Sequence, residues 1–155
     1  LTQAKGDQLE RVVSVFPWVA CVDAFQHWLY TNPNHSHEER NAKWVELYTQ
    51  FHPDTVKWDG YEEELSILWQ KQLHIFEVPF YYIEYAIAQL GAIGVWRNVM
   101  KNKEKGMEAF MAGLSAGAMR NIPYVYSKAG VKFDFSHDYV KQMAQFVSDQ
   151  KSKLN

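Results

Sequence analysis

The sequence contains a single cysteine, Cys21, and has no long block of basic residues. One cysteine cannot form an internal disulfide, and its place in an apolar run is typical of a buried thiol or a reducing compartment, so we expect a cytoplasmic protein. The formal net charge is −2 and the sequence pI is about 6.3, so nothing in the charge pattern favours nucleic-acid binding. The N-terminal stretch LTQAKGDQLE also lacks the basic and then apolar pattern of a signal peptide.

The motifs of several common enzyme classes are missing as well. No GxGxxG, P-loop or GxSxG sequence occurs, which removes the usual signatures of dinucleotide binding, nucleoside triphosphate binding and serine hydrolases. The zinc-peptidase motif HExxH is not completed, because His37 and Glu38 are followed by Asn41 where the second histidine would stand. Ser36 and Glu39 instead form the pattern of a capping box at a helix start. We therefore expect no metal site in this chain.

The chain is rich in apolar and aromatic residues, which make up 47% and 15% of its 155 positions. This length supports a single domain over residues 1–155 with a substantial core. Apolar side chains recur at the helical spacings of three and four, and no alternating strand pattern of any length appears. We predict an all-α fold, an irregular bundle of about seven helices. Pro17 is expected to stop or kink the first of them, because proline lacks the amide that would continue the helix.

The bundle is predicted to be organised around a buried central helix at roughly residues 79–101. Val78 precedes Pro79, and proline disfavours helix in the residue before it while favouring a helix start, so one helix should end and another begin here. From there to residue 96 only Glu84 and Gln89 are strongly polar, which predicts a helix buried on every side. The run is too short and too interrupted for a membrane span, so we expect no membrane insertion.

Tyrosines gather at the front of that helix. Tyr81 and Tyr85 are four residues apart and Tyr82 and Tyr85 three apart, so their rings rise from neighbouring positions on one side. The preceding helix is predicted from Tyr61 to about Phe76. His74 falls near its end, and Gln72 belongs to its solvated face. The tyrosine hydroxyls either anchor to backbone groups or point into a cleft, and the residues alone fit both explanations.

Three stretches carry a resemblance to a known family. Residues 74–92, HIFEVPFYYIEYAIAQLGA, resemble the C-terminal part of the catalytic domain of the oligoendopeptidase F family, relatives of thimet oligopeptidase. Residues 17–33, PWVACVDAFQHWLYTNP, and residues 130–136, GVKFDFS, resemble segments before and after it. These proteins are zinc endopeptidases that cut short peptides in a channel between two mostly helical halves. The resemblance implies that residues 1–155 are the C-terminal portion of such a catalytic domain.

The resemblance also implies how the catalytic groups are divided. His74 and Tyr85 stand where the family places a histidine and a tyrosine that bind substrate and stabilise the oxyanion of the tetrahedral intermediate, with Tyr82 and Tyr81 as secondary candidates. The family's HExxH and its downstream glutamate ligand precede the segment seen here, so the zinc of the complete enzyme is expected on ligands outside this chain. We expect the chain to be truncated at its front. Whether it counts as an enzyme stays open.

The expected partners follow from this assignment. They are a short peptide substrate and a missing N-terminal catalytic segment, or a partner chain that supplies it. The isolated chain is expected to be inactive. Without its other half the domain should also expose an apolar patch, so a homo-oligomer is a further expectation.

Two other functions fit the residues. The chain could be a free-standing, non-catalytic helical module that binds a peptide or a partner, or it could be a purely structural bundle. Ligand or haem binding through His74 and the aromatic side chains would need an observed cofactor.

Overall fold

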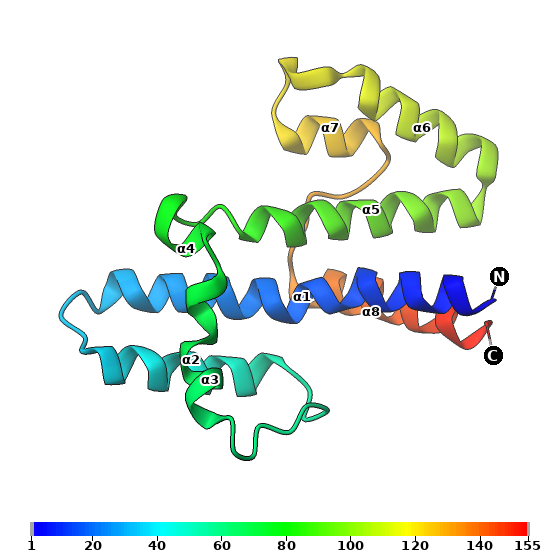
Figure 1. Cartoon of the computed structure of the whole chain (residues 1–155). Helices are drawn as coiled ribbons and strands as arrows, with labels where there is room; N and C mark the ends of the chain where they lie inside the picture. Colours follow the sequence, from blue (N-terminus) through cyan, green and yellow to red (C-terminus); the bar gives the residue numbers. More distant parts are fainter. Residues whose placement is uncertain (1, 155) are drawn as a thin grey trace. The chain divides into compact units, whose positions relative to one another are not determined.

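The computed structural model describes residues 2–154, and in this range the chain is built from helices without a β-strand (Figure 1). The all-α prediction is confirmed. The helices are α1 (Thr2–Thr31), α2 (His37–Phe51), α3 (Glu62–Ile67), η1 (Leu68–Lys71), α4 (His74–Glu77), α5 (Ile83–Lys101), α6 (Lys103–Ser115), η2 (Gly117–Met119), α7 (Ile122–Lys128) and α8 (His137–Ser152), where η marks a short 3₁₀ helix.

The chain divides into two compact units. The terminal unit comprises Leu1–Val12 and Ile87–Asn155, and the inner unit comprises Val13–Ala86. The helices α1 and α5 each begin in one unit and end in the other. The single domain expected over residues 1–155 stays a prediction.

The core of the inner unit is aromatic. Within it α2 runs back along α1 (Figure 1), and the fully buried rings of Phe25 and Trp44 meet edge to face with centroids 5.2 Å apart. Trp18 packs against Trp44 in the same way at 5.5 Å. Such ring pairs add about 0.5–1.5 kcal/mol each to the free energy gained by burying their area. The other buried members of this core are Cys21, Val22, Leu47, Trp69 and Ile75.

Close helix packing at small residues holds the terminal unit together. Gly91 of α5 is buried, and a Cβ atom there would lie 2.5 Å from the Tyr126 hydroxyl oxygen of α7. The same hydroxyl donates a hydrogen bond of 2.9 Å to the Ile87 carbonyl. The end of α8 lies beside the first turns of α1, where Lys151 Nζ donates to Glu10 Oε1 at 3.0 Å. The ion pair joins segments from the two ends of the sequence.

The central helix is shorter and less buried than predicted. It begins at Ile83 and not at Pro79, because Phe80 has a φ of 58°, a left-handed conformation that no helix can continue. Only one stripe of α5 is fully buried, while Ala88 and Ala92 are exposed. The prediction of burial on every side was therefore wrong. Apolar residues follow one another here without a helical period, so the sequence does not show which side of the helix other segments cover. The buried stripe consists of Leu90, Gly91, Ile93 and Gly94.

Pro17 was predicted to stop or kink the first helix, and the stop does not occur. α1 runs through Pro17 as one helix of 30 residues. Interrupting a helix with proline costs about 3 kcal/mol. Val19 and Cys21, two and four residues after the proline, are fully buried. Burial of an apolar side chain contributes about 1.5–3 kcal/mol. Packing of the residues after the proline therefore outweighs the lost hydrogen bond.

One helix in the described range is long and apolar enough to cross a membrane by length and composition alone. This is Gln3–Thr31, in which the most apolar window has a mean hydropathy of 1.2. The core helix of a soluble protein passes the same test, and Val19, Val22 and Phe25 of this helix are fully buried. The expected absence of membrane insertion stays a prediction.

Candidate functional site

The four residues that the sequence singles out lie together in the inner unit, around the connection from α4 to α5. The His74 ring stacks on Tyr81 with centroids 5.9 Å apart. It meets Tyr82 and Tyr85 edge to face at 4.9 and 5.8 Å. Tyr85 in turn lies 5.8 Å from Tyr81 and 5.0 Å from Tyr82. The structure thus forms one cluster from all four, which we call the His74 cluster.

The shape of the chain around Pro79 explains why the tyrosines return to His74. α4 ends at Glu77, as predicted, because Val78 precedes the proline. Phe80 then takes its positive φ, and its ring lies 4.8 Å from that of His27 on α1. The same ring lies 5.2 Å from that of Tyr30, so contacts with α1 accompany a backbone conformation that a bulky residue rarely adopts. Sequence reasoning missed Phe80, because its local sequence gives no sign of a left-handed residue.

Both ring nitrogens of His74 have partners. Its Nε2 lies 3.3 Å from the Tyr85 hydroxyl oxygen, and its Nδ1 lies 2.6 Å from the amide nitrogen of Gln72. The placement of Gln72 on a solvated face was therefore wrong, since its side chain is half-buried and directed at His74. The predicted helix over residues 61–76 breaks into α3, η1 and α4, and so the helical spacing that pointed Gln72 outward does not hold. The only sign of this contact in the sequence is that a glutamine stands two positions before the histidine.

Exposure separates the three tyrosines. Tyr81 and Tyr85 are 44% and 43% exposed, so both are open to a ligand. Tyr82 is half-buried, and this burial raises the pKa of its hydroxyl, while a hydrogen bond from Trp18 acts in the opposite direction. The cluster therefore has an accessible side and an inner side. The roles of these residues in substrate binding stay predictions.

The described residues do not fit a zinc ion. Among residues 2–154, no three His, Cys, Asp or Glu side chains come close enough to hold a metal. His35 Nε2 accepts a hydrogen bond of 2.8 Å from Arg40 Nε, and Ser36 and Glu39 form the predicted capping box of α2. His35 and His37 thus lie at the start of α2, where neighbouring polar groups bond to one another.

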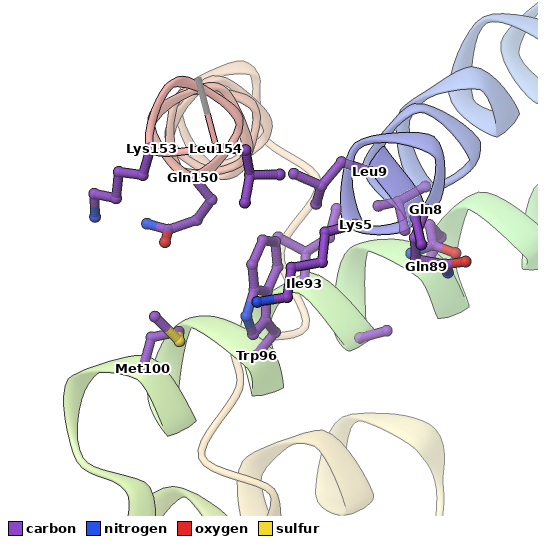
Figure 2. A pocket seen from close by; sticks show the side chains of 13 residues that line it. Lys5, Gln8, Leu9, Gln89, Ile93, Trp96, Met100, Gln150, Lys153 and Leu154 are labelled. Carbon is purple, nitrogen blue, oxygen red and sulfur yellow. The ribbon is translucent and has the colours of Figure 1, made fainter. Parts of the chain in front are cut away.

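A hollow lies within the terminal unit, and its lining includes none of the four predicted site residues (Figure 2). It has a volume of about 750 Å³ and is lined by α5, the first turns of α1 and the end of α8. Trp96 and Ile93 contribute to its apolar lining, and its ionisable side chains are Lys5 and Lys153. Two lysines without an acidic or histidine partner do not form a catalytic set.

Comparison with known protein families shows to which family the chain belongs. The sequence model of peptidase family M3 matches residues 2–145. The chain belongs to peptidase family M3. This confirms the predicted resemblance at the level of the family, and M3 peptidases are in general zinc-dependent. No curated protein sequence matches the M3 chain significantly.

The M3 chain also resembles a solved X-ray structure, that of a protein assigned as oligoendopeptidase F. The TM-score is 0.83 at 24% sequence identity, and the match covers 97% of the M3 chain. It covers 26% of the other chain, so the M3 chain spans about a quarter of that protein's length. At this identity the match shows a shared fold.

Proposed function

We propose that the chain is the substrate-binding part of a zinc-dependent oligoendopeptidase that hydrolyses short peptides. Membership of peptidase family M3 supports a peptidase origin. The observation that carries the proposal is the His74 cluster, in which His74 and Tyr85 are hydrogen-bonded at 3.3 Å and Tyr85 is 43% exposed. A hydrogen-bond donor at an accessible surface is the group needed to bind a peptide carbonyl.

The chemistry assigned to the cluster is stabilisation of negative charge. When water attacks a peptide bond, the carbonyl oxygen becomes an oxyanion, and a donor placed to meet it lowers the barrier. Tyr85 would donate its hydroxyl proton to that oxygen, and the ring faces of Tyr81 and Tyr85 would contact apolar parts of the peptide. In this proposal the zinc ligands and the general base belong to a segment outside this chain.

The first test is a cleavage assay on the 155-residue chain itself. The purified chain is mixed with zinc and a quenched fluorescent peptide, with a known zinc endopeptidase as positive control. We expect no hydrolysis, because the described residues offer no zinc site. Zinc-dependent hydrolysis that is abolished by a chelator would place the metal within this chain and contradict the proposed division.

The second test is Tyr85→Phe in the complete peptidase. Loss of one oxyanion donor typically lowers kcat about 100-fold to 1,000-fold, so we expect a drop of this order with unchanged zinc content. Tyr61→Phe is the matched control, because Tyr61 is 60% exposed, lies in the same unit and is not part of the His74 cluster. An unchanged kcat in Tyr85→Phe would remove Tyr85 from the mechanism. A raised KM with unchanged kcat would leave Tyr85 as a substrate-binding residue without a role in oxyanion stabilisation.

A further inference from the structure

A chain of hydrogen bonds leads from the core of the inner unit to the His74 cluster. The indole Nε1–H of Trp18 donates to Gln72 Oε1 at 3.0 Å. The Gln72 amide nitrogen lies 2.6 Å from His74 Nδ1, and His74 Nε2 lies 3.3 Å from the Tyr85 hydroxyl oxygen. Trp18, which lies 54 residues before Gln72, is thereby joined to His74 and Tyr85 in one row of polar groups.

The chemistry of Trp18 decides the direction of every bond in this row. An indole nitrogen can only donate, so the side of the Gln72 amide that faces it must be the carbonyl oxygen. The amide NH₂ group then faces His74, and an amide nitrogen can likewise only donate. The same indole N–H is also within reach of the Tyr82 hydroxyl, which leaves its role as a donor unchanged.

The tautomer of His74 follows from this direction. Because Nδ1 accepts the hydrogen bond from Gln72, it carries no proton, and the neutral ring must hold its proton on Nε2. The Nε2–H group then donates to the Tyr85 oxygen, and the hydroxyl proton of Tyr85 is left unused within the cluster. In the other tautomer Nε2 would accept that proton, and Tyr85 would have no donor to offer.

We propose that Gln72, oriented by Trp18, is a positioning residue that holds His74 in the Nε2–H tautomer and so directs the Tyr85 hydroxyl proton toward the substrate. The catalytic consequence rests on the proposed function, in which Tyr85 donates to the oxyanion. The tautomer itself does not, because it follows from contacts within this chain. Trp18 is well placed to fix the amide, since its ring packs on the fully buried Trp44.

Nuclear magnetic resonance of the 155-residue chain with ¹⁵N-labelled histidine tests the proposal directly. Long-range proton–nitrogen correlations show which ring nitrogen is protonated, because a bare nitrogen resonates far downfield of a protonated one. The sequence has six histidines, and His74→Asn identifies the His74 signals by their loss. We expect the neutral His74 ring to show the Nε2–H pattern.

Gln72→Glu is the decisive variant, because a carboxylate still accepts from Trp18 but can no longer donate to His74. We expect the His74 proton to move to Nδ1, where the new carboxylate accepts it. Gln70→Glu is the matched control, because it introduces the same negative charge two residues away at an exposed position. This variant should leave the Nε2–H pattern of His74 unchanged. Gln72→Met, which has a similar shape and no amide, should give a mixture of both tautomers.

Two results would overturn the proposal. One is an Nδ1–H pattern in the unmodified chain, and the other is a tautomer that is the same in the unmodified chain, Gln72→Glu and Gln72→Met. Neither measurement needs zinc or turnover, so the proposal and the peptidase function can fail separately. An Nε2–H ring combined with full activity of Tyr85→Phe would leave the tautomer assignment intact and reject the catalytic role.

Discussion

Replacing Gly106 with alanine should loosen the packing of α6 on α5. Gly106 lies in the first half of α6 and is buried. A Cβ atom at this position would lie 2.6 Å from Val99 Cα, 2.7 Å from Val99 N and 2.9 Å from the carbonyl carbon of Asn98. All three are backbone atoms of α5, which cannot rotate aside as a side chain could. The methyl group therefore has room only if the two helices move apart.

Two opposing effects set the size of the loss. Adding a methyl group to a tightly packed position costs typically about 1–3 kcal/mol, and contact with rigid backbone favours the upper end of that range. Alanine is about 1 kcal/mol more favourable than glycine within a helix, which offsets part of it. The free energy of unfolding should fall by about 2 kcal/mol, which for a chain of this size lowers Tm by about 4–8 °C.

Thermal unfolding followed by far-ultraviolet circular dichroism measures the effect. The matched control is Gly6→Ala, because Gly6 is also in a helix of the terminal unit and no described atom lies within 4 Å of the added Cβ. That variant should leave Tm unchanged or raise it slightly through helix propensity. If Gly106→Ala raised Tm as well, the close approach of α5 and α6 would be refuted.

Two further predictions concern a buried group and a half-buried group of the inner unit. Burial raises the pKa of the Cys21 thiol to about 12, so the folded chain should not react with a thiol reagent at neutral pH until it unfolds, and rapid labelling of the native protein would contradict this burial. Burial also lowers the pKa of His52, helped by the charge of Lys71 and opposed by a hydrogen bond to the Tyr48 carbonyl, so the unfolded chain binds the proton more tightly. Stability should therefore fall as the pH drops below about 6.5, and His52→Gln should flatten this dependence in urea unfolding series, whereas equal slopes for both proteins would assign the dependence to other groups.

Local signals in the sequence were enough to predict the fold class and several helix ends. The capping box of Ser36 and Glu39 is present as expected, and Ser136 caps the last helix by accepting from the Tyr139 amide. Such bonds join residues three apart, so they form wherever the local sequence allows them. The end of α4 before Pro79 follows from a restriction on neighbouring residues and was predicted for the same reason.

Features that depend on distant contacts could not be predicted in this way. Proline at position 17 is a strong local signal for a helix end, yet burial of Val19 and Cys21 keeps α1 continuous. The left-handed residue Phe80 packs its ring against His27 and Tyr30, which come from another helix. In both cases the free energy of packing between segments exceeds a local preference of a few kcal/mol, and this balance is not visible in a short stretch of sequence.

The sequence by itself determined that the chain is helical, that it belongs to peptidase family M3, and that His74 and three tyrosines deserve comparison with a peptidase site. Only the tertiary structure decided that these side chains form one cluster and that Gln72 faces His74. The bond that fixes Gln72 comes from Trp18, 54 residues earlier. Hydrogen-bond direction depends on which donor and acceptor meet in space, and the folded chain alone brings them together.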